Sequence, residues 1–366
     1  MKTLAELQAE CVELGITVNS NGRPSKEPYI AALRNHHWER ERPGEPPPIQ
    51  VSPMLLADWK DLDADTAREL EADHHAWIVQ EKKDGVRALL HVNAGGVRIT
   101  GRCTSEVTYR LSEYQTNLPH LTRGLESIAG TVLDGELVCP QAKVNTGNTV
   151  TTSPLQAAVA VLATSPDNAA QIQRDDQTKL QLFVFDILKY AGEDVTGLPL
   201  SDRLGLLTEA SAKIDNPYIE IVPSFSVNKT AIHEQIIANG GEGTVWKKAS
   251  EPYEPGRRVK HWIKRKRDIQ VEAFVTDFKL GTPERGHAHL VGAVEFSIPN
   301  CDGQPKPIAW VSSWTDEERD VMTWKDREGN PTLNPTCYGR KAIIVGQDEA
   351  GRSGRIRHAR LKKWTA

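Results

Sequence analysis

The chain of 366 residues has no apolar run long enough to cross a membrane, for which about 18 consecutive apolar residues are needed. Its first residues, MKTLAE, lead into polar and acidic positions, which excludes a secretory signal. Its five cysteines lie far apart and form no C-x-x-C pair, so neither a zinc site nor a disulfide framework is expected. A reducing cytoplasm is therefore the expected location.

Internal repeats and long low-complexity tracts are also absent, and the apolar content is ordinary for a globular protein. The length predicts two or three domains. A proline-rich string, ERPGEPPPIQ at 41–50, predicts a semi-rigid linker after a short N-terminal segment, 1–40. Mixed strands and helices are expected from 51 to 267, and short strands from 268 to 366.

The expected elements after the linker follow from apolar runs and turn residues. Thr315 begins a capping box for a short helix among the last strands. Five strands with one helix in about a hundred residues fit a small barrel of the OB type. Before that region, strands are expected at 77–82, 87–93, 97–101, 132–138 and 182–188, and a buried helix at 155–163.

The N-terminal segment predicts a small helical module. Thr3 and Glu6 form a capping box, apolar residues recur at helical spacing to Leu14, and a second helix begins near Ser25. This pattern resembles a SAP motif, a helix–extension–helix that binds duplex DNA. Arg23 and Lys26 are its candidate DNA contacts. The alternative is that two small helices dock on the next domain.

The net charge of −4 conceals an uneven distribution. The string GRRVKHWIKRKR at 256–267 contains no acid, and the charged positions of 352–363 are basic throughout. Acidic residues concentrate elsewhere, for example in 58–73. The basic runs suit a nucleic-acid partner, with Arg257 and Arg258 as candidate DNA contacts. Solvated surface charge is the alternative.

Four short strings occur in series with domain-scale gaps: KKDGVR at 82–87, LDGELV at 133–138, EGTVWK at 242–247 and WIKRK at 262–266. A lysine attacks phosphorus only after losing its proton, through desolvation or cationic neighbours. Lys82 ends a predicted strand, and Asp84-Gly85 predicts a tight turn that exposes its tip, because glycine permits unusual backbone angles. A surface turn is the alternative for this string taken alone.

The other strings supply carboxylates and further cations. Glu136 interrupts a hydrophobic strand, which packing alone does not justify. Glu136 and Glu242 together can hold Mg²⁺, which prefers oxygen ligands. Lys264 and Lys266 alternate, so one strand face would aim both at phosphate. A solvated charge run is the alternative.

In this order the strings resemble those of ATP-dependent DNA ligases, and the likeness covers nearly the whole chain after residue 50. The resemblance implies that Lys82, rather than Lys83, bonds covalently to AMP. It also implies that Glu136 faces the ribose and that Phe185 stacks on the base, although Phe185 also suits an apolar core. Further expected contacts to the nucleotide are Gln80, Glu81, Arg87, Arg102, Lys247 and Lys264.

Two positions depart from the family pattern. The family usually has S-R where this chain has Gly101-Arg102, and that arginine is expected to contact the sugar and the nicked-strand phosphate. The family's last motif resembles R-x-D-K and orients the departing pyrophosphate. Here its aspartate is missing. Arg360, Lys362 or Lys363 are the candidates for binding pyrophosphate.

The resemblance implies an α+β nucleotidyltransferase (adenylation) domain followed by an OB-fold. The expected enzyme is a monomer that uses ATP and Mg²⁺ to seal nicks or join ends in duplex DNA, away from membranes. The compact size resembles viral or phage ligases, whose location would be the host cytoplasm. An RNA ligase, a GTP-dependent capping enzyme and a non-catalytic DNA-binding protein are the alternatives. An NAD-dependent ligase is disfavoured, because no cysteine quartet is present.

Overall fold

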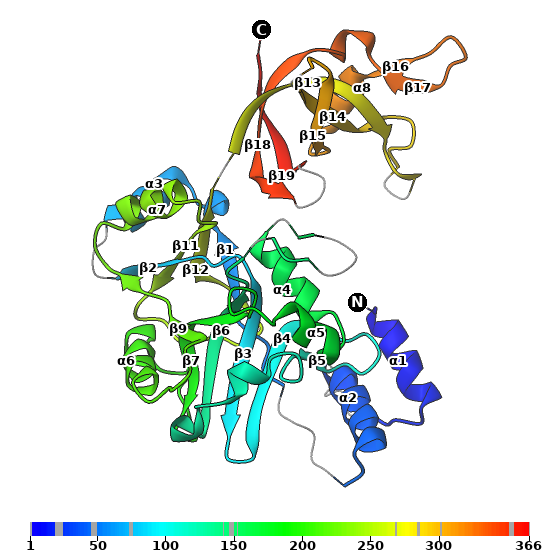
Figure 1. Ribbon diagram of the computed structural model, residues 1–366. Helices are drawn as coiled ribbons and strands as arrows, with labels where there is room; N and C mark the ends of the chain where they lie inside the picture. The colour runs from blue at the N-terminus through cyan, green and yellow to red at the C-terminus, as the bar shows by residue number, and fades with distance from the viewer. Residues whose placement is uncertain are drawn as a thin grey trace. The chain divides into compact units, whose positions relative to one another are not determined.

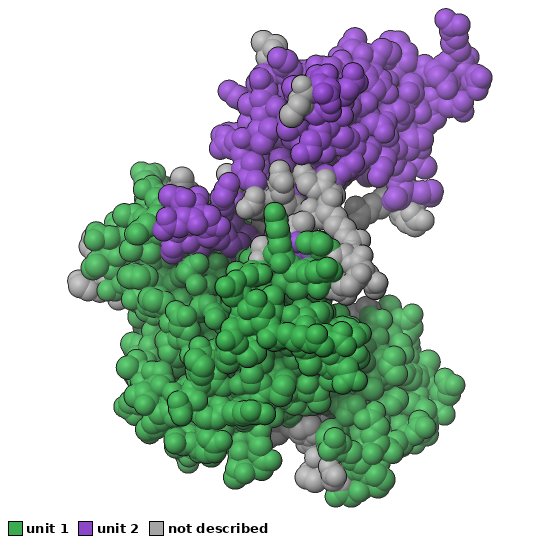
Figure 2. All heavy atoms as spheres, in the orientation of Figure 1, with its two compact units in different colours: residues 1–150, 154–235, 244–265 green, residues 151–153, 236–243, 266–366 purple. Residues whose placement is uncertain are grey.

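The chain folds into two compact units, which Figure 2 colours separately and Figure 1 traces as a ribbon. Unit 1 comprises residues 1–150, 154–235 and 244–265, and unit 2 comprises residues 151–153, 236–243 and 266–366. Among the described residues, no helix is both long and apolar enough to span a membrane. The computed structural model describes residues 2–18, 25–44, 50–72, 76–141, 143–145, 150–151, 153–267, 269–283, 286–300, 302–350 and 355–365.

Two helices begin unit 1, α1 (Leu4–Glu13) and α2 (Glu27–Glu41). The expected capping box is present: the Thr3 side chain accepts a hydrogen bond from the Glu6 backbone N–H, and the Glu6 carboxylate accepts one from that of Thr3. The helices pack around a small apolar core that is completed by Tyr109, far along the chain. The buried members of this core are Leu7, Cys11, Leu33 and Tyr109.

The larger sheet of unit 1 has seven strands in the order β5-β4-β3-β6-β7-β8, with β9 paired in parallel to β7. The strands expected at 87–93, 97–101, 132–138 and 182–188 are all present in it. Its bounds are β3 (Val86–Asn93), β4 (Gly96–Thr104), β5 (Leu111–Glu113), β6 (Thr131–Val138), β7 (Gln181–Tyr190), β8 (Glu193–Asp194) and β9 (Ile219–Ile221).

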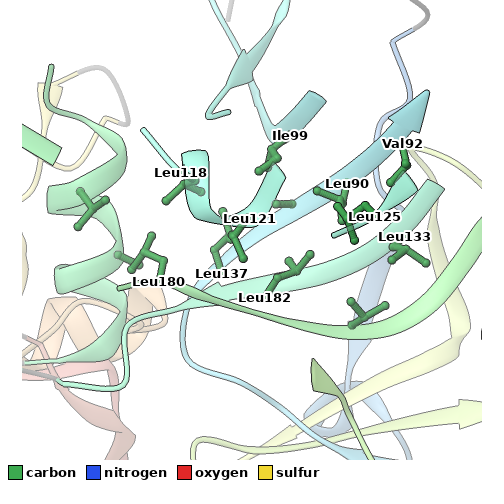
Figure 3. Packing of buried hydrophobic residues seen from close by; sticks show 14 of the residues in the cluster. Leu90, Val92, Ile99, Leu118, Leu121, Leu125, Leu133, Leu137, Leu180 and Leu182 are labelled. Carbon is green, nitrogen blue, oxygen red and sulfur yellow. The ribbon is translucent and has the colours of Figure 1, made fainter. Parts of the chain in front are cut away.

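One face of this sheet is covered by helices. The expected helix, α4 (Pro154–Leu162), buries Ala157, Ala158 and Val161, while Val159 on the same helix is 46% exposed. Leucines from β3, β6 and β7 meet Ile99 of β4 and leucines at two short turns in the main core of unit 1, as Figure 3 shows. The other helices that contribute buried residues to this core are α5 (Pro166–Ile172) and α6 (Leu200–Ser211), and the turns are η2 (Pro119–Thr122) and η3 (Glu126–Ile128).

The second sheet of unit 1 has the strand order β1-β12-β11-β2-β10. An apolar cluster containing Leu89 of β3 and Trp262 of β12 packs the two sheets together. The bounds are β1 (Leu55–Asp58), β2 (Trp77–Glu81), β10 (Ser224–Phe225), β11 (Gly243–Lys248) and β12 (Arg258–Lys266), with η1 (Trp59–Asp61), α3 (Ala64–Ala72) and α7 (Lys229–Ala238) in the connections.

Gly85 is needed for a different reason than the sequence suggested. Its φ is not among the positive values, so no unusual backbone angle is involved. A Cβ at this position would lie 2.2 Å from the Leu137 carbonyl oxygen of β6. The glycine of the second string behaves similarly, since a Cβ on Gly135 would lie 2.8 Å from the Phe183 oxygen. Both motif glycines therefore permit close approach of neighbouring strands.

Unit 2 contains an antiparallel sheet in the order β15-β14-β13-β18-β19. The helix α8 (Asp316–Met322), which lies between β15 and β18 along the chain, begins with the expected Thr315 capping box. A hairpin of β16 (Thr323–Lys325) and β17 (Pro331–Leu333) and the turn η5 (Pro335–Cys337) follow α8. The sheet strands are β13 (Ile269–Leu280), β14 (Val291–Pro299), β15 (Pro305–Val311), β18 (Lys341–Ala350) and β19 (Arg355–Trp364).

Candidate nucleotide site

A cavity in unit 1 lies against strands of both sheets. It leaves about 400 Å³ of empty space, part of it open to solvent. Six residues that the sequence assigned to a nucleotide come together here with Lys82, although they lie up to about 165 positions apart. The lining residues are Leu56, Gln80, Glu81, Lys82, Lys83, Arg87, Glu136, Phe185, Val245, Lys247 and Trp262.

Lys82 directly follows β2, and its side chain lines the cavity as a half-buried residue. The next lysine is held by its neighbours. The Lys83 amine lies 2.6 Å from a Glu81 carboxylate oxygen and 4.3 Å from the centre of the Phe183 ring. This contact occupies Lys83 and Glu81 with each other, and it fits the assignment of the reactive amine to Lys82.

Arg87 is held by a carboxylate of the second string. Its Nε and Nη2 donate to the two oxygens of Asp134, each at 2.6 Å. The Tyr253 hydroxyl also donates to Asp134, at 2.7 Å, and accepts a hydrogen bond from the Met54 backbone N–H. Although Arg87 is buried, the Asp134 charge raises its pKa. Arg87 thus supplies a fixed positive charge to the cavity wall.

Two aromatic rings and a lysine form another wall. Phe185 of β7 and Trp262 of β12 meet edge to face, with ring centres 6.2 Å apart. The Lys247 amine lies 4.5 Å from the Phe185 ring centre and 3.8 Å from that of Trp262. It also donates to the Phe185 carbonyl oxygen at 3.3 Å. Burial lowers the pKa of Lys247 to about 7, so protons exchange here near neutral pH.

Gln80 presents an acceptor that no described residue satisfies. Its side chain is 1% exposed, and its amide nitrogen donates to the Ser224 hydroxyl at 2.9 Å. Its Oε1 atom is buried and has no hydrogen-bond partner among the described residues. The same holds for the indole N–H of Trp262. Buried polar atoms in native proteins nearly always have partners, so this acceptor and this donor suit a polar ligand in the cavity.

The lysines of the fourth string each meet a carboxylate. The Lys264 amine lies 3.2 Å from Asp58 of β1, within unit 1. The Lys266 amine lies 2.8 Å from Glu242, within unit 2. Each ammonium therefore pairs with an acid, a contact that the sequence did not indicate, and the assignment of both amines to phosphate stays a prediction. A phosphate group would have to compete with those acids or displace them.

The remaining predicted residues lie outside the cavity lining. Arg102 is exposed on β4. Arg257 pairs with Glu254 at 2.7 Å, and Arg258 donates to the Leu56 carbonyl. Lys26 donates to the Lys2 carbonyl at 2.8 Å. In unit 2, Lys362 donates to Gln270 at 2.9 Å, Lys363 is exposed and Arg360 is half-buried on β19, whereas Arg23 lies outside the described residues.

Several residues of the site were not identified from the sequence. Asp134 was visible inside LDGELV, and its pairing with Arg87 could have been inferred from two adjacent strands with opposite charges. Asp58, Ser224 and Tyr253 had no local signal, because their partners lie between 119 and 206 positions away. Trp262 was part of WIKRK, but only its lysines were considered.

A lysine at a strand end, a carboxylate, an aromatic wall and an unsatisfied amide oxygen around one cavity define a nucleotide-binding class of site. Comparison with known families matches residues 53–266 to the ATP dependent DNA ligase domain. The chain belongs to the ATP-dependent DNA ligase family. The matched segment contains all four strings of the sequence.

Similar proteins include a DNA ligase and a DNA ligase-like protein. A DNA ligase of Haloarcula marismortui is 30% identical over 249 residues, which is 67% of this chain and 42% of the relative. The SPbeta prophage-derived DNA ligase-like protein LigB of Bacillus subtilis is 26% identical over 232 residues, covering 62% of this chain and 72% of that protein. The chain spans less than half of the length of its archaeal relatives.

A solved structure resembles the fold over most of the chain. It comes from a structure–function study of Lig E DNA ligases described as binding DNA with a minimal scaffold. The TM-score is 0.56 at 17% identity, covering 87% of this chain and 100% of the other. At this identity the likeness concerns the fold, and the chemistry must be argued from the cavity itself.

Proposed function

We propose that this protein is an ATP-dependent DNA ligase that seals nicks in duplex DNA. The cavity that gathers Lys82, Glu136, Phe185 and Lys247 inside the family-matched segment carries this proposal. The Lys82 amine attacks the α-phosphorus of ATP, a nitrogen–phosphorus bond forms and pyrophosphate leaves. AMP then passes to the 5′-phosphate at the nick, and the 3′-hydroxyl displaces AMP to form the phosphodiester.

The cavity residues suit each part of ATP. The Gln80 amide oxygen suits the exocyclic amino group of adenine, since it is a buried acceptor with no hydrogen-bond partner among the described residues. Phe185 offers a ring for stacking on the base, and Glu136 can accept hydrogen bonds from ribose hydroxyls. The fixed charge of Arg87 and the amine of Lys247 provide a positive wall for phosphate.

Glu136 and Glu242 are our candidates for holding Mg²⁺, as hard oxygen ligands. The metal would offset charge on the triphosphate and on the transition state. Glu242 pairs with Lys266 in unit 2, so binding a cation there requires that amine to move toward phosphate. We assign pyrophosphate binding to Arg360, Lys362 or Lys363.

Unit 2 supports an OB-type barrel. Its strands lie in the order β15-β14-β13-β18-β19, and α8 lies between β15 and β18 along the chain. This is the arrangement expected of a five-stranded Greek-key barrel. We also propose that it closes over the nick during the reaction. For the N-terminal helices, duplex binding of the SAP type remains our prediction, supported by the two helices α1 and α2.

The first test is covalent labelling. Protein incubated with Mg²⁺ and ATP labelled at the α-phosphate should form an acid-labile adduct, and Lys82→Ala should abolish it. Lys83→Ala is the matched control and should retain most of the adduct, because Lys83 is paired with Glu81. An adduct that persists in Lys82→Ala would refute the proposed mechanism.

Substrate preference separates the alternatives. The proposal requires adduct formation with ATP in preference to GTP, and sealing of nicked DNA in preference to nicked RNA. A GTP preference would indicate a capping-type enzyme, and sealing confined to RNA would indicate an RNA ligase. A protein that binds DNA but forms no adduct with any nucleotide would be non-catalytic.

A further inference from the structure

The N-terminal helices are fixed to the rest of unit 1 through one loop. Tyr109, in the turn between β4 and β5, is 5% exposed and belongs to the core of the helical pair. The Lys2 amine donates to its hydroxyl at 3.0 Å, and that hydroxyl donates to the Glu10 carboxylate. Nearby, Arg110 pairs with Glu41 at 2.6 Å. The pair is therefore docked through both its apolar core and its charged rim.

Docking creates a second cavity between α2 and the β4–β5 edge, with about 1870 Å³ of empty space, part of it open to solvent. Three arginines line it, from three different elements: Arg42 after α2, Arg98 on β4 and Arg110 before β5. Two acids, Glu41 and Glu113, also line it, which leaves one net positive charge among these five residues. The other lining residues include Ser105, Thr108, Ser112 and Gln115, whose hydroxyl and amide groups can donate hydrogen bonds.

The arginines are held in place for an anion. The Arg42 and Arg110 guanidinium carbons lie 5.1 and 5.3 Å from the ring centre of Trp38, so both groups pack on one indole. Arg98 lies 3.3 Å from Glu113. Burial lowers the pKa of Arg98, the charge of Glu113 opposes this shift, and the charge of Arg110 adds to it, so the two guanidinium groups repel one another beside one carboxylate. A bound anion would relieve that repulsion.

This cavity continues a line of positive charge on β4. Arg98 and Arg102 lie four positions apart on β4, whose pairing with β5 is irregular between Thr100 and Thr104. Four residues of strand span about 13 Å, which corresponds to roughly four base pairs of duplex along its axis. Arginine, serine, threonine and glutamine are among the side chains that contact DNA phosphates.

We propose that the cavity lined by Arg42, Arg98 and Arg110 binds the sugar–phosphate backbone of duplex DNA beyond the nick. The proposal rests on the proposed ligase function, because Arg102 is taken as the contact nearest the nick. The helical pair then acts as one wall of a rigid DNA groove, with Trp38 and Glu41 of α2 and Arg42 just after it contributing to the site.

The test measures affinity of the adenylylated protein for nicked duplexes that lack the 3′-hydroxyl, with long arms or with either arm cut to about six base pairs. Arg42→Gln should bind the long-armed duplex more weakly than wild type. The ratio of wild-type to variant affinity should be about 3.5-fold larger at 50 mM than at 200 mM salt, as expected for one lost phosphate contact. The deficit should vanish on the duplex whose shortened arm no longer reaches the cavity.

Two further variants sharpen the result. Glu41→Gln removes a negative charge from the cavity and should tighten binding, whereas a purely structural role for this residue predicts weaker binding. Arg68→Gln removes an exposed arginine on α3 that is not part of the cavity lining, and should leave affinity unchanged. Equal deficits of Arg42→Gln on long and short arms, or none at 50 mM salt, would overturn the proposal. Failure of the proposed function is distinguishable, because it would remove the ATP adduct from the wild type itself.

Discussion

The two units of this protein differ in what they bury. Among the described residues, unit 1 buries five aspartate, lysine or arginine side chains: Asp134, Asp186, Arg203, Lys229 and Lys247. Unit 2 buries one, Glu295, and its partner Arg355 is 32% exposed. The core of unit 2 is otherwise almost entirely apolar. Buried charge is expensive, so its concentration in one unit calls for a physical reason.

The position of these buried charged residues relative to the candidate site supplies the physical reason. Asp134 orients Arg87 on the cavity wall, and Lys247 belongs to the wall itself. Asp186 directly follows Phe185 in the chain and pairs with Arg203. Both side chains are fully buried, and the pair fixes β7 to α6. Unit 1 thus holds charges in place before a ligand arrives, which is how preorganised sites stabilise transition states. Unit 2, with an apolar core, offers its charges at the surface.

The largest expected effect is the loss of Asp134. Asp134→Ala leaves the Arg87 guanidinium buried without its carboxylate and should lower the free energy of unfolding of unit 1 by about 3–5 kcal/mol. Glu295→Ala in unit 2 should cost only about 1 kcal/mol, because its partner can reach water. Hydrogen exchange resolved by peptide would measure each unit separately. Similar losses of unfolding free energy in both units would contradict the proposed difference in how the units hold buried charge.

The second prediction concerns Lys247 and pH. Its pKa is about 7 in the folded protein, against 10.5 as its ordinary value, so unfolding takes up a proton between these pH values. Stability should therefore rise with pH through this window, by up to about 1.4 kcal/mol per pH unit. Attraction to the two rings favours the charged amine and reduces this slope.

Lys247→Met removes both the titrating amine and its desolvation penalty. Relative to wild type, the variant should gain most stability near pH 7 and progressively less toward pH 9. Urea unfolding at several pH values measures the difference, in which other titrating groups cancel. If the free energies of unfolding of the two proteins changed in parallel with pH, the Lys247 amine would not be buried in the folded protein.

The third prediction concerns the stability of unit 1 at acidic pH. His233 of α7 lies 2.8 Å from the Thr244 hydroxyl, which also accepts a hydrogen bond from the Trp246 indole. Burial and the charge of Arg265 lower the pKa of His233 to about 4, below its ordinary value of 6.5. Its stabilising contribution is full above pH 6.5 and is lost as pH falls toward 4.

His233→Gln keeps a hydrogen-bonding group but removes the titration. Thermal unfolding of unit 1 should then depend less on pH between 6.5 and 4 than in the wild type. His289→Gln, at an exposed histidine of unit 2, is the control and should not change the profile. A profile of His233→Gln that matches the wild type would place the acid sensitivity elsewhere, with the buried His91 as the next candidate.

Local sequence signals predicted the strands well and the contacts poorly. Apolar runs and turn residues gave β3, β6 and β7, and Thr3 and Thr315 marked two helix starts correctly. The cavity lining was largely predicted, because family motifs specify positions along the chain. The carboxylates opposite Lys264 and Lys266 were missed as partners, and the role of Gly85 was misjudged. Those features depend on which strands become neighbours, which periodicity alone does not determine.

The smallest expected effect tests whether orientation of a single buried amide matters. Ser224 accepts the Gln80 amide hydrogen at 2.9 Å, which directs the Gln80 oxygen away from it. Ser224→Ala should leave folding nearly unchanged, since Ser224 is exposed and one hydrogen bond contributes about 1 kcal/mol. Without that anchor the amide can rotate and present its N–H₂ group, which suits the carbonyl of guanine. The preference for ATP over GTP in adduct formation should then fall by about fivefold, measured as the ratio of kcat/KM. An unchanged ratio would mean that Gln80 does not read the base, and that its buried oxygen serves unit 1 in another way.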